Sequence, residues 1–252
     1  MPLVDTPYGS VFYAESNRAS SPVILIHGAG SSHLGWSKEL RRLEDRRVLT
    51  IDLPGHGRST SQGYAQIKPY AGAVLSLLDA LQIEQAILIG HSMGGAISQM
   101  LAVEHPARVA GLVLIGTGAY LGVNPDLLRN IEENYDLATE LINKWSWSKD
   151  TPEDLRRLGL AELRKVPQNV LYGDYAACSQ FDLREQITQI NAPALVIGGT
   201  ADKMTPLALN QFLVDNIRQS TWVQIEGGGH WMMLEQPQAV GAAITAWLRG
   251  VA

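Results

Sequence analysis

Short runs of consecutive β-branched and apolar residues are the feature that most constrains how this chain can fold. They occupy residues 23–26, 48–51, 86–89, 112–115 and 194–197. Runs of this length, bounded by Gly, Asp or Pro, are typical of strands buried on both faces of a parallel sheet. Helical patterns alternate with them at residues 34–43, 64–81, 96–104, 206–215 and 237–248. This alternation predicts an α/β fold with a mostly parallel, doubly wound sheet.

Both ends of the predicted sheet carry weaker signals. Residues 3–4 and 11–14, with Gly9 between them, predict an antiparallel hairpin that precedes the first parallel strand. Residues 221–225 predict one more strand near the C-terminal end. With 46% hydrophobic residues in 252, the chain can bury a sizeable core around such a sheet.

The stretch from residue 117 to residue 191 breaks the alternation. It contains no β run of four residues, and it holds three helical patterns, at 126–144, 152–165 and 168–181. Ligands of open α/β sheets bind beyond the carboxyl ends of the strands. We therefore expect residues 117–191 to form a helical lid over the site, on a core made of residues 1–116 and 192–252.

The segment Gly90-His91-Ser92-Met93-Gly94 lies between a predicted strand and a predicted helix. A serine at the apex of a tight strand-to-helix turn needs a strained backbone, and neighbours without side chains let the turn close. Such a turn exposes the hydroxyl at a helix N-terminus, where the next backbone N–H can face a developing oxyanion. The pattern predicts that Ser92 is a nucleophile.

A serine nucleophile needs a general base that an acid holds in one tautomer. Of the six histidines, His230 follows three glycines, which would let its loop approach a site closely. Asp202 lies just past the strand predicted at 194–197. The order Ser92, Asp202, His230 is the one found with this kind of nucleophile turn. We predict that they form a catalytic triad, and the alternative for Asp202 is a carboxylate that caps the following helix.

These motifs resemble those of the α/β-hydrolase family, and the resemblance covers nearly the whole chain. Besides the serine turn, it is carried by residues 27–30 (HGAG), 52–59 (DLPGHGRS), 199–202 (GTAD) and 229–237 (GHWMMLEQP). The resemblance implies an α/β-hydrolase fold with the lid inserted after the sixth strand. It also implies an oxyanion hole made of the backbone N–H groups of Ala29 and Met93. We expect Asp52, His56 and Arg58 to brace their loop.

The resemblance implies a serine hydrolase, and we expect a carboxylesterase that acts on small to medium-sized esters. An enol-lactonase or a carbon–carbon hydrolase of ring-cleavage products is the alternative, because hydrolases of that kind often carry a Trp after the catalytic His. They also bind an acidic substrate with a lid arginine, for which this chain offers Arg156, Arg157, Arg164 and Arg184. A ligand receptor built on the same fold is the non-enzymatic alternative.

We expect an apolar pocket, lined by aromatic residues of the lid and by the residues that follow the histidine. The candidates are Trp145, Trp147, Tyr172, Tyr175, Phe181, Trp231 and Met232.

Composition and short motifs limit the kinds of partner and cofactor that we expect for this chain. The net charge of −5 argues against a nucleic-acid binder, and no apolar run reaches the roughly 18 residues of a membrane-spanning helix. The single Cys178 excludes an intramolecular disulfide, and no metal or nucleotide motif is present. The N-terminal sequence lacks the pattern of a signal peptide. We therefore expect a cytoplasmic enzyme, monomeric or homodimeric, that acts on a small-molecule ester without a cofactor.

Overall fold

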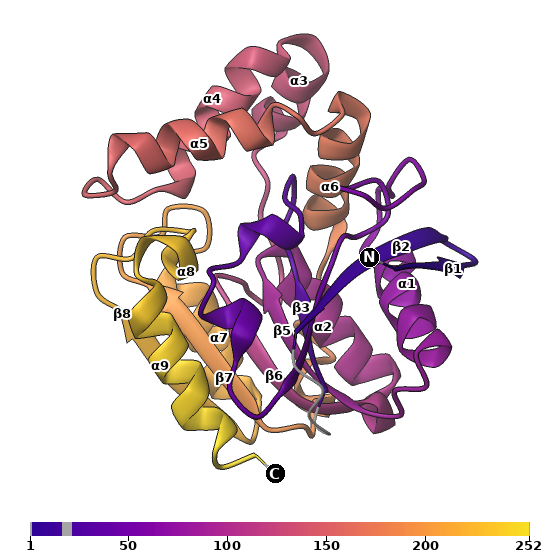
Figure 1. Ribbon diagram of the computed structural model, residues 1–252. Helices are drawn as coiled ribbons and strands as arrows, with labels where there is room; N and C mark the ends of the chain where they lie inside the picture. Colours follow the sequence, from indigo (N-terminus) through magenta and orange to yellow (C-terminus); the bar gives the residue numbers. More distant parts are fainter. Residues whose placement is uncertain (1, 17–21, 252) are drawn as a thin grey trace.

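The computed structural model describes residues 2–16 and 22–251, and a single sheet forms its centre (Figure 1). Its strands follow the spatial order β1-β2-β4-β3-β5-β6-β7-β8. Their bounds are β1 Leu3–Thr6, β2 Gly9–Ser16, β3 Pro22–Ile26, β4 Arg47–Ile51, β5 Ala86–His91, β6 Val109–Ile115, β7 Ala194–Gly199 and β8 Ser220–Ile225. Strand β2 pairs antiparallel with β1 and β4, and all other neighbouring strands are parallel. The predicted fold class is confirmed.

Helices cover both faces of the sheet, because successive side chains of a strand point to opposite faces. In β3, Ile24 and Ile26 belong to a core cluster that also contains side chains of α1, α2 and α7, whereas Val23 and Leu25 belong to a second cluster that includes α9. The helix bounds are α1 Ile67–Ala80, α2 Met93–Glu104, α7 Leu207–Asn216, α8 Met232–Glu235 and α9 Pro237–Leu248. In the part of the chain that the structure describes, no helix could span a membrane.

The helix predicted at residues 34–43 is wrong. The structure has two short 3₁₀ turns there, His33–Gly35 and Leu40–Arg42, with Trp36 between them in an extended conformation. The apolar spacing that imitated a helix arises because Trp36 and Leu40 are buried in the second core cluster. Gly35, near the start of the segment, disfavours a helix there.

Four helices lie between β6 and β7: α3 Pro125–Glu133, α4 Tyr135–Ser146, α5 Glu153–Leu163 and α6 Gln168–Gln180. We call residues 117–191 the insertion. Figure 1 shows α3, α4 and α5 as a layer beyond one end of the sheet, with α6 leading back toward the core. The pattern at 126–144 is divided by Asn134, whose side chain accepts a hydrogen bond from the N–H of Leu137 at the start of α4.

The insertion has a core of its own. Leu127, Ile131, Ile142 and Leu171 are buried together in a third cluster, drawn from α3, α4 and α6. The insertion therefore has packing of its own, although Ala177, Cys178 and Phe181 pack in the first core cluster. The division of the chain into a core and a lid stays a prediction. Of the residues assigned to the core segments, 1, 17–21 and 252 lie outside the described part of the chain.

Candidate active site

Ser92 occupies the sharp turn between β5 and α2. Its backbone is strained, with φ 52° and ψ −117°, and its carbonyl oxygen accepts a hydrogen bond of 2.9 Å from Thr117 Oγ1. The turn can close only if the residues two positions before and two positions after Ser92 have no side chain. A Cβ on Gly90 would lie 2.3 Å from the Gly94 carbonyl oxygen, and a Cβ on Gly94 would lie 2.0 Å from that of Ile26. The glycines therefore let α2 start directly against the end of β3.

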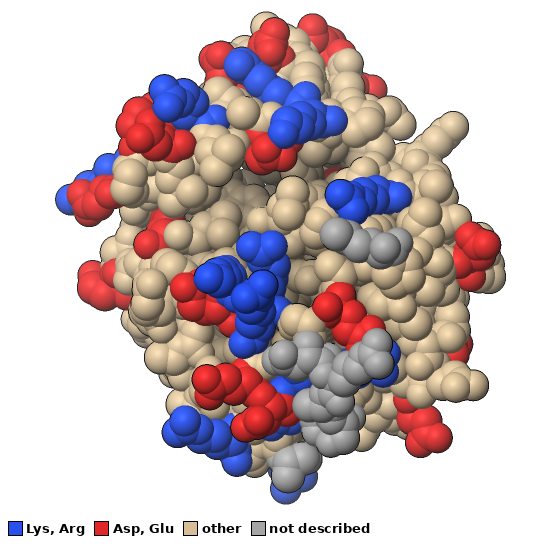
Figure 2. All heavy atoms as spheres, in the orientation of Figure 1, with Lys and Arg blue, Asp and Glu red and all other residues tan. Residues whose placement is uncertain are grey.

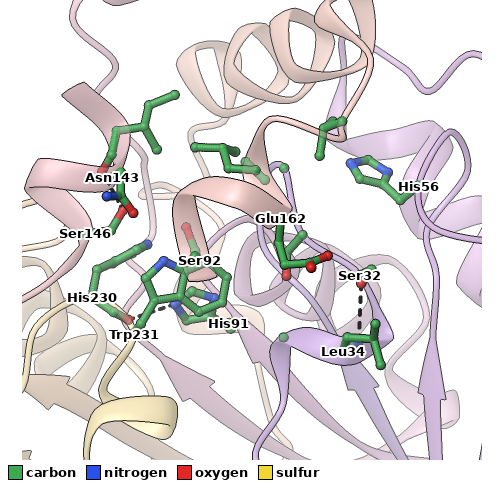
Figure 3. Close-up of a pocket in the computed structure, with 18 of the residues that line it drawn as sticks. Ser32, Leu34, His56, His91, Ser92, Asn143, Ser146, Glu162, His230 and Trp231 are labelled. Carbon is green, nitrogen blue, oxygen red and sulfur yellow. Dashed lines mark hydrogen bonds between the residues drawn. The ribbon is translucent and has the colours of Figure 1, made fainter. Parts of the chain in front are cut away.

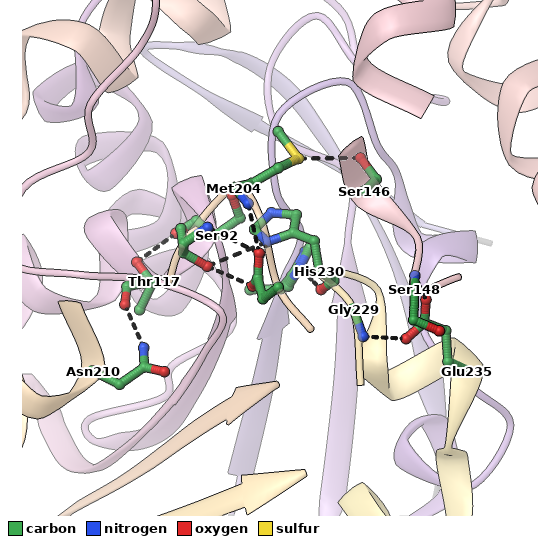
Figure 4. Close-up of polar contacts among 12 residues, drawn as sticks. Ser92, Thr117, Ser146, Ser148, Met204, Asn210, Gly229, His230 and Glu235 are labelled. Carbon is green, nitrogen blue, oxygen red and sulfur yellow. Dashed lines mark hydrogen bonds and ion pairs between the residues drawn. The ribbon is translucent and has the colours of Figure 1, made fainter. Parts of the chain in front are cut away.

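Asp202 follows the end of β7 and His230 follows the end of β8, and their side chains are in contact. Figure 4 shows His230 close to Ser92. Asp202 Oδ2 is 2.9 Å from His230 Nδ1 and accepts a hydrogen bond of 2.6 Å from Thr205 Oγ1. The N–H groups of Met204 and Thr205 donate to Oδ1 at 2.8 and 2.9 Å, so the carboxylate also braces its own turn. Burial alone would raise the pKa of Asp202, but His230 and Thr205 outweigh it, and the pKa lies below its usual value.

The ionised Asp202 favours the His230 tautomer with the proton on Nδ1, which leaves Nε2 as the proton acceptor. Ser92 and His230 line the same cavity, and both close-ups place their side chains next to each other (Figures 3 and 4). Among the described residues, no hydrogen bond within 3.5 Å joins the Ser92 hydroxyl to His230. Catalytic hydrogen bonds are often long in ligand-free structures and tighten when substrate is bound.

The backbone of His230 is held from two sides. Its N–H donates to the Ser146 carbonyl oxygen at the end of α4 at 2.9 Å, and its own carbonyl oxygen accepts from His91 Nε2 at 2.9 Å. The pKa of His91 lies well below its usual value, because the ring is buried and next to His230. His91 is therefore a neutral donor that supports the loop of His230.

Glu235 of α8 connects the same loop to the insertion. One carboxylate oxygen accepts from the N–H of Gly229 at 2.5 Å, and the other accepts from the N–H of Ser148 and the hydroxyl of Thr151, both at 2.8 Å. Gly229 directly precedes His230, whereas Ser148 and Thr151 lie between α4 and α5. The position of the histidine loop is thus tied to the insertion.

The loop after β3 passes beside Ser92, because a Cβ on Gly28 would lie 3.0 Å from the Ser92 Cβ. His27 Nδ1 donates to the Gly28 carbonyl oxygen at 2.8 Å, and Nε2 accepts from the N–H of Leu53 at 3.0 Å. This pattern requires a neutral ring, and burial together with neighbouring His56 lowers the pKa of His27 to about 4.

The peptide plane fixed by His27 also contains the Ala29 N–H. In a planar trans peptide this N–H points away from the Gly28 carbonyl oxygen that His27 holds. Among the residues that the structure describes, neither the Ala29 N–H nor the Met93 N–H donates to a protein acceptor. Both groups are therefore available to a ligand, as the predicted oxyanion hole requires.

Asp52 holds the loop after β4, as expected. Its carboxylate accepts from the N–H of His33 at 2.6 Å, from His33 Nδ1 at 2.8 Å and from the N–H of Arg58 at 2.9 Å. Burial alone would raise the pKa of Asp52, but the hydrogen bonds from His33 and the nearby His27 lower it below its usual value. Asp52 is therefore an anionic brace of the loop and lies outside the Asp202–His230 pair.

His56 has a partner that the sequence did not reveal. Its Nε2 atom is 2.7 Å from Oδ2 of Asp174, a buried carboxylate in α6. The only available signal was an acidic residue within an otherwise apolar and small stretch at 170–178.

The cavity above Ser92 has a volume of about 740 Å³ and lies between the core and the insertion. Of the aromatic residues predicted to line it, Trp147, Tyr175 and Trp231 do so. The rings of Trp147 and Trp231 stack, with centroids 6.1 Å apart. The insertion also provides aliphatic lining residues that were not predicted: Leu121, Val123, Ile142, Leu155, Leu158, Leu163 and Val166.

The other four predicted aromatic and apolar residues do not line this cavity. Trp145 and Tyr172 pack against the core of the insertion, and Phe181 is buried in the first core cluster. Met232 starts α8 and is buried in the second cluster, beneath the histidine loop. Each is used in packing, because its position on its element directs the side chain away from the cavity.

The four lid arginines also lie outside the cavity lining. Arg157, Arg164 and Arg184 pair with acidic residues, and Arg156 donates to the carbonyl oxygens of Ser148 and Lys149. Arg58 and Lys165 do line the cavity, and Lys165 Nζ lies 2.6 Å from a Glu162 carboxylate oxygen. Figure 2 shows a hollow below the insertion that is bordered mostly by uncharged residues.

Comparisons with known proteins agree with this architecture. The model of the alpha/beta hydrolase family matches residues 23–243. A 3-oxoadipate enol-lactonase from Acinetobacter baylyi is 31% identical over 94% of this chain and 92% of its own. A 2-hydroxy-6-oxononadienedioate/2-hydroxy-6-oxononatrienedioate hydrolase from Burkholderia vietnamiensis is 27% identical over 95% and 91%. The structure of a thermophilic esterase, 29% identical, covers 100% of this chain and 98% of its own with a TM-score of 0.90. The chain belongs to the alpha/beta hydrolase family.

Proposed function

We propose that this protein is a serine hydrolase that cleaves small to medium-sized carboxylic esters through an acyl-enzyme on Ser92. The observation that carries the proposal is the strained Ser92 beside the Asp202–His230 pair, at one wall of an apolar cavity. The backbone N–H groups of Ala29 and Met93 have no acceptor within the described part of the chain, and both belong to segments next to the serine.

The reaction follows from these groups. His230 Nε2 takes the Ser92 proton while Oγ attacks the ester carbonyl carbon, and the carbonyl oxygen becomes an oxyanion held by the Ala29 and Met93 N–H groups. Asp202 stabilises the imidazolium, which then protonates the departing alcohol. Water, deprotonated by His230, attacks the acyl-enzyme and releases the carboxylic acid with Ser92 restored.

An ester without charge is the substrate that the cavity favours. Aliphatic and aromatic side chains supply most of the lining, and burial of apolar substrate surface contributes roughly 25 cal/mol for each Å². A carboxylate in the cavity would need a cation to offset its desolvation. The four arginines proposed for this role are engaged elsewhere, and of the two cations that line the cavity, Arg58 and Lys165, the second is paired with Glu162. In this proposal residues 117–191 act as a lid that excludes water and limits acyl length.

A lactonase is the second candidate, because the enol-lactonase from Acinetobacter baylyi is 31% identical to this chain. A lactone is a cyclic ester, so the same triad and oxyanion hole would open its ring. Arg58 and Lys165, which line the cavity, are the side chains that would face an acidic lactone.

The test compares kcat/KM for nitrophenyl esters from acetate upward with an enol-lactone and a carboxylate-bearing dienone. We expect the neutral esters to be preferred and added methylenes to raise kcat/KM until the cavity is filled. Preference for the lactone or the dienone by orders of magnitude would replace the ester proposal. An absence of turnover on every substrate would favour a receptor.

A labelling experiment tests the nucleophile. A fluorophosphonate adduct should appear on Ser92 by mass spectrometry, and Ser92→Ala should lower kcat by roughly 10⁴–10⁶. Ser98→Ala is the matched control, because Ser98 is buried in α2, where its hydroxyl donates to the Gly94 carbonyl oxygen. An adduct on another residue would contradict the assignment.

A further inference from the structure

Asp174 connects the insertion to three parts of the core. It lies in α6 and is fully buried, with an exposed fraction of 0%. Its Oδ2 atom accepts from the N–H of Gly30 at 2.8 Å and from His56 Nε2 at 2.7 Å, and its Oδ1 atom accepts from the Tyr70 hydroxyl at 2.7 Å. The donors belong to the loop after β3, the loop after β4 and α1. Each partner is more than 100 residues away in the sequence.

The hydrogen-bond pattern assigns charges to the Asp174–His56 pair. His56 Nε2 faces the carboxylate, and Nδ1 lies 3.1 Å from the Pro54 carbonyl oxygen, which can only accept. Both nitrogens must carry protons to satisfy these contacts, so the ring is an imidazolium beside a carboxylate. Burial alone would lower the pKa of His56, but the Asp174 charge outweighs it and the pKa lies above its usual value.

A buried ion pair is an expensive way to stabilise a fold, because both charges lose their hydration. Its benefit is geometric, since a fully satisfied buried network permits one arrangement of its members. Here the network contains a backbone group of the oxyanion loop, the Gly30 N–H, and it is completed by a residue that the insertion provides.

Gly30 follows the residue whose N–H is to bind the oxyanion. The peptide that carries the Ala29 N–H is fixed by the bond from His27 to the Gly28 carbonyl oxygen. The next peptide, which carries the Gly30 N–H, is fixed by Asp174. Two hydrogen bonds thus determine the direction of the Ala29 N–H, one from the core and one from the insertion.

We propose that Asp174 is a positioning residue, through which α6 holds the oxyanion loop so that the Ala29 N–H meets the developing oxyanion. The insertion then contributes to the chemical step in addition to covering the cavity. This inference rests on the proposed ester hydrolysis at Ser92.

Asp174→Asn tests the inference. An amide of the same shape has one oxygen and an NH₂ group, so it cannot accept from all three donors. Because oxyanion contacts strengthen in the transition state, kcat should fall about 10- to 100-fold while KM changes less than about threefold. Affinity for a boronic acid that forms a tetrahedral adduct on Ser92 should fall in parallel. Hydrogen exchange at the Gly30 amide should become at least about tenfold faster, a readout independent of activity.

Thr139→Val is the matched control. Thr139 is a buried polar residue of α4, and its hydroxyl donates only to the Asp136 carbonyl oxygen, away from the oxyanion loop. We expect its kcat and boronate affinity to stay within about twofold of wild type. Rates are expressed per active site, counted by fluorophosphonate titration, so that a misfolded fraction does not lower the apparent kcat.

The outcomes separate the two proposals. Wild-type kcat and boronate affinity in folded Asp174→Asn overturn the positioning role, as does an equal loss in Thr139→Val. Failure of the wild-type protein to hydrolyse esters or to be labelled at Ser92 overturns the proposed function instead. If Asp174→Asn does not fold, Tyr70→Phe removes the bond from Tyr70 to Asp174, together with the one that the hydroxyl accepts from the Tyr64 N–H, and should lower kcat about 3- to 10-fold at unchanged KM. Unchanged kcat in Tyr70→Phe then overturns the positioning role.

Discussion

Ser92, the proposed nucleophile, has a strained backbone. Its φ of 52° and ψ of −117° lie where residues with a Cβ are rarely found. Strain of this kind costs about 1–3 kcal/mol, and it persists because the packing of α2 against β3 over-determines the turn. The geometry that exposes the hydroxyl therefore lowers the stability of the folded protein.

Replacement of Ser92 by Gly should stabilise the protein while it abolishes turnover. Glycine relieves the strain but costs about 0.5–1 kcal/mol of chain entropy, so the expected net gain is about 1 kcal/mol. For a chain of this size that gain raises Tm by about 2–4 °C. Ser92→Ala is the reference in thermal unfolding, because alanine keeps the Cβ and the strain. A lower Tm for Ser92→Gly than for Ser92→Ala would contradict the prediction, because it would mean that the backbone of residue 92 is not strained.

Asp202→Asn should lower kcat by about 10⁴, because an amide favours the wrong His230 tautomer, as in serine proteases. Asp52→Asn is the comparison, since Asp52 is also a buried carboxylate that bonds a histidine. We expect it to lower Tm and to change kcat at most about tenfold. Steady-state kinetics on one nitrophenyl ester suffices for both variants. Near-normal turnover of Asp202→Asn would transfer the orienting role to another acid.

For single residues, the sequence predicts positions that are fixed by a local motif. Ser92, Asp202 and His230 each follow a strand in a recognisable motif, and the carboxyl ends of parallel strands meet at one edge of the sheet. The cavity lining depends on which way each helical side chain points. Trp145 and Trp147, two residues apart, point to different sides, and only Trp147 lines the cavity. Asp174 was missed because all its partners are distant in sequence.

Among the elements, the contact between α2 and β3 brings the turn at Ser92 beside the loop after β3. A Cβ on Gly94 would lie 2.0 and 2.7 Å from the carbonyl oxygens of Ile26 and His27. Backbone atoms of a central strand cannot move aside as the end of a flexible side chain could. The close approach of the two elements therefore depends on the absence of a side chain at one position.

Gly94→Ala should lower the free energy of unfolding by at least about 3 kcal/mol, at the upper end of the cost of overpacking. Gly241→Ala, in α9, is the matched substitution, because the nearest atom to its new Cβ would be the Glu39 Cβ at 3.6 Å. That variant should gain about 0.5–1 kcal/mol from helix propensity. Urea unfolding measures both, and equal values for the two variants would contradict the role given to the contact.

The predicted helices and strands were found where the burial of a segment matches the spacing of its apolar residues. The five central parallel strands, β3 to β7, are mostly apolar and buried because they are covered on both faces, and each was found. The helix predicted at 34–43 failed, since apolar residues at helical spacing bury equally well from a chain of short turns. The division at Asn134 also went unpredicted, because the apolar period continues from α3 into α4.

For the molecule as a whole, the buried histidines determine how stability responds to acid. His27 has a folded pKa of about 4 against an ordinary value of 6.5, so unfolding takes up protons between these values. Its contribution is fully present above pH 6.5 and is lost as the pH falls toward 4. His91 acts in the same direction. His56 acts in the opposite direction, because its pKa is raised and its contribution is lost only as the pH rises.

Stability should therefore fall as the pH is lowered from 6.5 to 4, and His27→Gln should flatten that dependence by up to about 3 kcal/mol. Urea unfolding at several pH values in this window measures the effect. Asp52 and Asp202 do not interfere, because their lowered pKa values confine their contributions to pH below about their ordinary value of 3.8. A slope in His27→Gln as steep as in wild type would mean that His27 is not buried in neutral form.

The hydrogen bonds that join the insertion to the loop at Gly229 and His230 affect whether the insertion can be exchanged between related proteins to change their substrate specificity. Ser146 provides the carbonyl oxygen that holds the His230 N–H, and Glu235 holds both sides of the same junction. A chimera that acquired another relative's helices at 117–191 alone would inherit a new cavity above a histidine without its backbone support. The segment that has to be exchanged is larger, because it includes the chain as far as Glu235, beyond His230 itself.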